Sequence, residues 1–290
     1  MSEWSLVYEE YDPDREGLRE ALCTLGNGYF CTRGAFPWAD ADGVHYPGTY
    51  LAGGYNRLKS DIAGEIIENE DLVNMPNWLA LTFRVEGGRW FSLRDITILS
   101  YRQELDMMRG LLLHSIRFRD GEGRETRLEE RRMVSMNCSH CGALEMKITA
   151  ENWSGILEVR SSIDGTVKNN GVPRYQGLEG NHIEPLWSGQ KGDDIIILQV
   201  RTVQSRLEVS QSARTKIFQN GAEVHPRHRL IQRRGFIGQH FFIEVGQKDE
   251  ITVEKIAFIY TSGDTGISES SLEAGKSASD AKRFDRLLEP

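Results

Sequence analysis

Apolar and polar residues alternate along most of the chain up to about residue 261. Apolar side chains occupy every second position of LEMKITA (144–150), and RLEVSQSA (206–213) largely follows the same period. Successive side chains of a strand point to opposite faces, so this period predicts strands with one buried face. Strands are expected within 80–93, 111–135, 143–152, 156–165, 194–203, 206–218, 239–246 and 250–262, the first two segments being hairpins around Glu86-Gly87-Gly88 and Asp120-Gly121-Glu122-Gly123.

These segments follow one another without intervening helices, which disfavours βαβ units. The pattern therefore predicts an all-β fold of antiparallel sheets packed as a sandwich over residues 1–262. The Gly-, Asn- and Pro-rich run 164–193 is expected to be a long irregular connection, of the kind that often carries function.

The character of the sequence changes after residue 262. Residues 263–290 are polar and Ser-rich at first and then place Ala281, Phe284, Leu287 and Leu288 at helical spacing. This predicts a linker that enters a helix, with an apolar stripe that nothing obvious in the chain would cover. We therefore expect the sequence to be part of a longer protein.

Charge and length limit the classes of function. The 290 residues carry 35 Lys and Arg against 43 Asp and Glu, a net charge of −8. Nucleic-acid binding normally leaves a basic surface, so this partner is not expected. An apolar run of about 18 residues would be needed to span a membrane, and MSEWSLVYEEYD lacks the features of a secretory signal. A soluble cytoplasmic protein without a membrane partner is expected.

Four cysteines occur, two of them in CSHC (138–141). The C-x-x-C spacing could serve zinc binding or thiol redox chemistry, but Cys23 and Cys31 are too far apart to form a second knuckle of that type. Reduced structural thiols are the favoured interpretation in a cytoplasmic protein. We assign no metal and no bound cofactor.

Two glycine-rich stretches, LGNGYFCTRGAF (25–36) and PGTYLAGGYN (47–56), raise the question of a phosphate loop. Neither contains G-x-G-x-x-G between a strand and a helix, and neither contains G-x-x-x-x-G-K-[ST]. We expect these glycines to permit positive φ or close backbone packing instead.

The residues that would suit sugar recognition lie close together in the sequence. Trp38 and Asp40 occur in AFPWADADG, and Asn74, Asn77 and Trp78 occur in LVNMPNW. An indole stacks on a sugar ring while amide and carboxylate groups bind its hydroxyls, so these five are the sugar-contact candidates. A buried tryptophan that anchors a sheet is the alternative.

Two charged segments have plainer explanations. The acidic residues between 65 and 71 are expected to belong to a solvated loop or cap rather than to a catalytic pair. In HPRHRLIQRRGF (225–236) the arginines suit an exposed strand that faces an acidic partner surface, with phosphate binding as the alternative. We assign no catalytic residue.

The order G-N-G-Y, R-G, P-G-T-Y and L-V-N-x-P-N-W within residues 26–78 resembles the N-terminal domain of glycoside hydrolase family 65. This family holds maltose, trehalose, kojibiose and nigerose phosphorylases and related hydrolases. The resemblance implies a large antiparallel β-supersandwich of the galactose mutarotase type, joined by a helical linker to an (α/α)6 barrel that these residues do not contain.

The resemblance also implies the chemistry of a parent enzyme. Inorganic phosphate as co-substrate would attack the anomeric carbon of an α-linked glucose disaccharide, with inversion, to give β-glucose 1-phosphate. The general acid and the phosphate site would lie on the barrel, so this chain would be a structural domain, inactive alone, in a homodimer. The identity of the disaccharide, and the choice between phosphorolysis and hydrolysis, stay open.

Two other classes of function remain. An aldose 1-epimerase would need a histidine and a carboxylate on one concave sheet face, for which His114, His182 and His240 are available. A free-standing carbohydrate-binding module would use Trp78, Trp38 or Trp187. An epimerase would change the optical rotation of α-glucose, and a binding module would be retarded on an oligosaccharide column.

Overall fold

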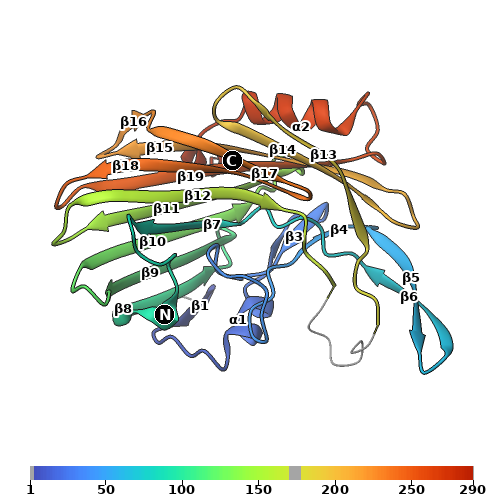
Figure 1. Ribbon diagram of the computed structural model, residues 1–290, viewed down its shortest axis with the longest axis horizontal. Helices are drawn as coiled ribbons and strands as arrows, with labels where there is room; N and C mark the ends of the chain where they lie inside the picture. The colour runs from blue at the N-terminus through green and yellow to red at the C-terminus, as the bar shows by residue number, and fades with distance from the viewer. Residues whose placement is uncertain (1–2, 170–177, 290) are drawn as a thin grey trace.

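A computed structural model describes residues 3–169 and 178–289 of the chain. Its sheets are antiparallel throughout these residues, and helices are few, as the sequence pattern predicts (Figure 1). The largest sheet has ten strands. In order across the sheet they are β1 (Ser5–Tyr8), β8 (Thr97–Asp106), β9 (Leu111–Arg119), β10 (Glu125–Val134), β11 (Cys141–Ala150), β19 (Glu250–Thr261), β15 (Glu208–Gln219), β14 (Ile195–Thr202) and β13 (Ile183–Lys191), with β16 (Ala222–Val224) paired to β15.

A second sheet of four strands packs on this large sheet. Its order is β17 (Arg227–Arg233), β18 (Phe236–Val245), β12 (Gly155–Asp164) and β7 (Leu81–Val85). Alternation along β12 shows how the layers form. Leu157 and Val159 are fully buried in the main core, whereas Arg160, which follows Val159, points to the other face of the sheet. The main core therefore lies between the two sheets, and the outward face of the second sheet is free to form a site.

Smaller elements complete the N-terminal part. They are helix α1 (Glu16–Leu22), a sheet of β2 (Leu25–Gly26), β3 (Phe30–Thr32) and β4 (Thr49–Leu51), a hairpin of β5 (Tyr55–Ile62) and β6 (Glu65–Leu72), and a 3-10 turn at Leu93–Asp95. In Figure 1 the β5–β6 hairpin projects from the body of the molecule.

The glycine-rich stretches belong to this small sheet. Gly53 has φ +74° in the turn after β4, a conformation that favours glycine. Gly142 of β11 lies outside these stretches but packs against one of the nearby candidates: an added Cβ there would lie 2.8 Å from Cζ2 of Trp78, so only glycine leaves room for the indole. The expectation that these segments are structural agrees with their place in the fold.

Two helices follow β19 and lie over the outer face of the large sheet, as Figure 1 shows for the first: α2 (Ser270–Ser279) and α3 (Phe284–Leu287). Ala274, Ala278 and Phe284 are fully buried there against residues such as Ile256. The prediction that the apolar stripe of residues 281–288 lacks a partner is therefore wrong, because the outward-facing apolar residues of β10, β11, β14 and β19 supply one.

Three local predictions also need correction. The connection 164–193 is not irregular throughout, because residues 183–191 form β13; residues 170–177 lie outside the described part. The acidic residues 65–71 form a strand of a hairpin, not a loop. The segment after Gly88 does not form the second strand of a hairpin; Phe91 only donates one backbone hydrogen bond to Phe83. Among the described residues, no helix is long and apolar enough to cross a membrane.

Candidate functional site

A cleft of about 460 Å³ is lined by the loop 36–45, the segment 90–94 and the outward face of the second sheet. Its size falls within the range of small-molecule sites. Aromatic side chains, carboxylates and arginines all contribute to its walls, the main ones being Trp38, Asp40, Asp42, Asn77, Trp90, Arg94, Arg160, Asp164 and Arg233.

The aromatic wall is built from stacked rings. Trp38 stacks on Phe36 with ring centroids 4.9 Å apart and meets Phe91 edge-on at 5.0 Å. Phe36 and Phe91 are buried in the main core, which fixes the indole, while Trp38 itself is half-buried at the cleft. A rigid, partly exposed indole of this kind suits the apolar face of a sugar ring.

Trp90 has a different environment. The guanidinium carbons of Arg160 and Arg84 lie 3.9 Å and 4.6 Å from its ring centroid. Glu158 accepts a 2.9 Å hydrogen bond from Arg84, and its Oε2 lies 2.7 Å from Nε2 of His240. Although burial opposes it, the hydrogen bond and charge of Arg84, followed by the hydrogen bond with His240, lower the pKa of Glu158, so this carboxylate is ionised and committed to its two partners.

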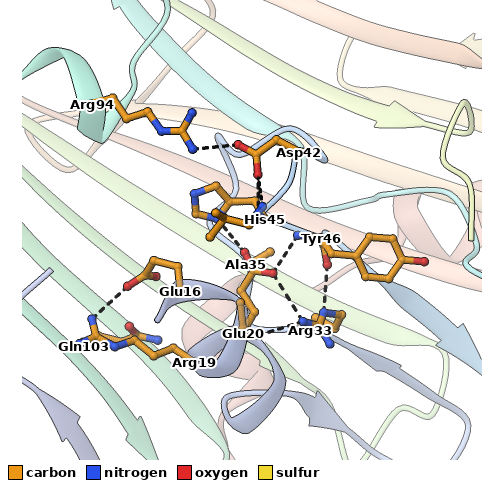
Figure 2. A network of polar contacts seen from close by, with 12 residues as sticks. Glu16, Arg19, Glu20, Arg33, Ala35, Asp42, His45, Tyr46, Arg94 and Gln103 are labelled. Atoms are coloured by element: carbon orange, nitrogen blue, oxygen red, sulfur yellow. Dashed lines mark hydrogen bonds and ion pairs between the residues drawn. The ribbon is translucent and has the colours of Figure 1, made fainter. Parts of the chain in front are cut away.

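The loop that carries Trp38 is held by buried charges of α1, shown in Figure 2. Glu20, which is 1% exposed, accepts hydrogen bonds from His45 Nδ1 at 2.8 Å and from the backbone N–H of Tyr46 at 2.9 Å. The hydrogen bond with Glu20 raises the pKa of His45. Arg33 adds a 3.0 Å hydrogen bond to the Tyr46 carbonyl, so the C-terminal end of the loop is tied to the body of the protein.

Asp42 organises the tip of the same loop. Its Oδ1 accepts the backbone N–H groups of Val44 and His45, and its Oδ2 pairs with Arg94 at 3.0 Å (Figure 2). Although burial opposes it, these hydrogen bonds lower the pKa of Asp42. The carboxylate is therefore a structural element of the cleft wall.

A buried lysine lies beneath the cleft floor. Lys255 of β19 is fully buried between the sheets and donates hydrogen bonds to the carbonyls of Ser162 and Ala80, at 2.7 Å and 3.0 Å. Both acceptor residues line the cleft. Burial lowers the pKa of Lys255 to about 7. The sequence pattern of β19 does not predict that Lys255 is buried, because a lysine at an inward position interrupts the apolar face of the strand.

The five sugar-contact candidates separate into two groups. Trp38, Asp40 and Asn77 line the cleft. Trp78 is fully buried over Gly142, and Asn74 is 2% exposed, with Oδ1 accepting the N–H of Thr49. Trp78 and Asn74 therefore cannot reach a ligand in the cleft; the interpretation of Trp78 as a sheet anchor fits its position.

Sequence reasoning missed Arg160 and Trp90 as cleft residues and Lys255 as the residue beneath the cleft floor. Arg160 could have been found from the alternation in ILEVRSSID, where a charged residue marks the outward face of β12. Trp90 carried no such signal, because it lies in an irregular segment whose position depends on the packing of Phe91.

The histidines do not form a joint site. His114 pairs with Glu130, His182 lies 3.2 Å from Asp71, and His240 pairs with Glu158, each in a separate part of the chain. His240 and Glu158 are 1% and 3% exposed, so this pair is closed to a substrate. Within the described ranges no group of three or more metal-ligating side chains exists, and all four cysteines are free thiols.

Comparisons with known proteins cover nearly the whole chain. The family model described as glycosyl hydrolase family 65, N-terminal domain, matches residues 6–290. An uncharacterized glycosyl hydrolase of Mycobacterium tuberculosis is 39% identical over 286 residues, which is 99% of this chain and 22% of that protein. A kojibiose phosphorylase of Caldanaerobacter subterraneus is 28% identical over 269 residues, covering 91% of this chain and 33% of the relative.

A solved structure agrees on the fold. It belongs to a protein from the human microbiome that is provisionally described as a kojibiose phosphorylase. The TM-score is 0.81 and the sequence identity 16%, and the match covers 98% of this chain and 36% of that protein. The chain thus spans about a fifth to a third of the length of these relatives.

Proposed function

This chain belongs to glycosyl hydrolase family 65 and corresponds to its N-terminal domain, and from that premise we propose that it is the non-catalytic domain of an enzyme acting on α-linked glucose disaccharides. The observation that carries the proposal is the extent of the match: the domain model covers residues 6–290, which is nearly this whole chain, whereas the match covers only 33% of the kojibiose phosphorylase and 22% of the glycosyl hydrolase. Their remaining length has room for a catalytic domain.

The reaction we propose is inverting phosphorolysis. Inorganic phosphate serves as co-substrate and takes the place that an activated water has in an inverting hydrolase, and the product is β-glucose 1-phosphate. The name of the kojibiose phosphorylase relative supports this choice over hydrolysis. We place the acid catalyst outside this chain, in the length of the relatives that the domain match leaves uncovered. In the cleft, Asp42 and Asp164 are committed to hydrogen bonds of their own loops.

The test uses the product of the whole gene. Kojibiose, maltose, trehalose and nigerose are each incubated with and without phosphate, and proton and phosphorus NMR follow the products. We expect one disaccharide to be consumed only when phosphate is present, with β-glucose 1-phosphate as the first product. Consumption at equal rates without phosphate would establish hydrolysis and overturn the phosphorylase assignment.

We also propose that the enzyme is a cytoplasmic homodimer. The four free thiols of this chain favour a reducing compartment. Light scattering of the whole gene product across a wide concentration range should give the mass of two chains. A constant single-chain mass would overturn the dimer.

A further inference from the structure

Five arginines project from the outward face of the second sheet. Pairing across the strands aligns Arg160 with His240 and Arg229, and Arg84 with Glu158. Side chains that are directly opposite on neighbouring strands share a face, so these positions form one surface. Its arginines are Arg84, Arg160, Arg227, Arg229 and Arg233.

The carboxylates on this surface do not neutralise it. Glu158 is shared by Arg84 and His240, and Asp164 accepts hydrogen bonds from the backbone and hydroxyl of Thr166. Within the described part of the chain, neither Arg160 nor Arg233 forms an ion pair with a carboxylate; Arg160 stacks on Trp90 and Arg233 on Phe236. Both line the cleft.

Arg160 is the more constrained of the two. Its Nε is buried without a hydrogen-bond partner, although its guanidinium lies 3.9 Å from the centroid of Trp90. Burial, followed by the charges of Arg84 and Arg233, lowers the pKa of Arg160, and the charge of Asp40 only partly opposes this. Since a half-buried guanidinium with the charges of two further arginines beside it is stabilised by a negative charge, the cleft is electrostatically complementary to an anion.

The opposite wall has a different chemistry. Trp38 presents a fixed, half-buried indole, and exposed Asp40 lies two residues further along the loop. A bare inorganic anion would use the arginines alone and leave a cleft of about 460 Å³ mostly unfilled. An acidic protein surface would contact the exposed arginines but would not need a hollow with an aromatic side.

We propose that this cleft binds a phosphorylated sugar, with the phosphate at Arg160 and Arg233 and the sugar ring against Trp38. Guanidinium groups match the geometry of phosphate oxygens, and carboxylate and amide groups of the cleft, from Asp40 and Asn77, are available for hydroxyls. This site lies on the N-terminal domain and does not depend on the catalytic activity proposed above.

The experiment is isothermal titration of the 290-residue chain with glucose 1-phosphate, glucose 6-phosphate, glucose and inorganic phosphate. The chain contains both of its own cores, so binding can be measured on these 290 residues. At least one of the two sugar phosphates should bind at millimolar concentration or below, and glucose and inorganic phosphate at least about tenfold more weakly.

Substitutions place the ligand in the cleft. Arg160→Gln and Arg233→Gln should each weaken the sugar phosphate by about tenfold or more, as expected for loss of a charge-assisted hydrogen bond. Arg233 is exposed and contacts the Phe236 ring only from outside, with its guanidinium carbon 4.4 Å from the ring centroid, so its loss leaves the main core intact. The neighbouring Arg234 is exposed and does not line the cleft, so Arg234→Gln is the matched control and should bind as the wild type does.

Three results would overturn the proposal. The first is the absence of binding by both sugar phosphates, which would leave the arginines to an acidic protein surface. The second is equal affinity for inorganic phosphate, which would remove the role of the sugar ring. The third is an equal loss of affinity in Arg233→Gln and Arg234→Gln, which would place the anion elsewhere. None of these results bears on disaccharide phosphorolysis by the whole gene product.

Discussion

Lys255 shows how one side chain can connect the core to the candidate site. It is fully buried, its only described acceptors are the carbonyls of Ala80 and Ser162, and burial lowers its pKa from 10.5 to about 7. A lysine whose folded-state pKa is depressed binds its proton more weakly in the folded chain than in the unfolded chain. Between about pH 10.5 and pH 7 the unfolded chain therefore binds one more proton than the folded chain, and the free energy of unfolding falls as the pH falls through this range.

Lys255→Met should remove this pH dependence. Between pH 9 and pH 7 the wild type should lose up to about 1.4 kcal/mol per pH unit relative to the variant. Urea unfolding of both proteins at the two pH values measures the difference. Exposed Lys59→Met is the control and should follow the wild type. Identical pH slopes in wild type and Lys255→Met would show that the lysine is hydrated in solution.

At the scale of elements, the cleft depends on a loop without regular structure. Segment 36–46 is positioned by charged groups. Glu20 on α1 accepts hydrogen bonds from His45 and Tyr46, and Asp42 accepts one from Arg94. Such contacts join residues that are far apart in the sequence. This explains why the sequence could suggest Trp38 and Asp40 as candidates but could not predict that they face Arg160 across a cleft.

Glu20→Gln tests whether this buried carboxylate positions the loop. The substitution keeps one acceptor oxygen but removes the charge, so the raised pKa of His45 should fall towards its ordinary value of 6.5. The stabilising pairing of His45 is present below that value and is lost as the pH rises through the folded-state pKa. NMR titration of the imidazole measures the shift, and faster proteolysis of the loop should accompany it.

The control for this prediction is Asp12→Asn near the same helix. Asp12 pairs with Arg15 on the surface, with side chains 39% and 74% exposed, so its removal should leave His45 unchanged. If the pKa of His45 stays raised in Glu20→Gln, another group holds the loop.

The parts of the fold that the sequence predicted share one property. Strands such as β11 and β15 alternate in polarity because one face packs in the main core between the sheets, while the other, although also largely buried, is more polar, and that period is local. The strand β13 was missed because its burial pattern is mostly intermediate or exposed at an edge of the large sheet, so no apolar period marks it. Trp78 was ambiguous because the cavity above Gly142 that receives it forms only in three dimensions.

At the scale of the whole molecule, the helices after β19 are part of the folded unit. Phe284 is fully buried under the guanidinium of Arg131, whose carbon lies 4.3 Å from the ring centroid, and Glu254 accepts its backbone N–H. The second core therefore extends the domain beyond the two sheets.

Phe284→Ala should lower the free energy of unfolding by about 3–5 kcal/mol, because it leaves a cavity beneath α3. Leu272→Ala on α2 is the control, since Leu272 is 64% exposed, and should change stability by less than about 0.5 kcal/mol. Chemical denaturation compares both variants with the wild type. A neutral Phe284→Ala would mean that α3 detaches from the sheet in solution.

The central claim is that this chain is a non-catalytic domain of a longer disaccharide-processing enzyme. The most direct test compares the 290-residue chain with the whole gene product in one assay of glucose 1-phosphate formation from a disaccharide and phosphate. The account predicts formation by the whole product and none by the chain. Turnover of the disaccharide by the 290-residue chain alone would contradict it.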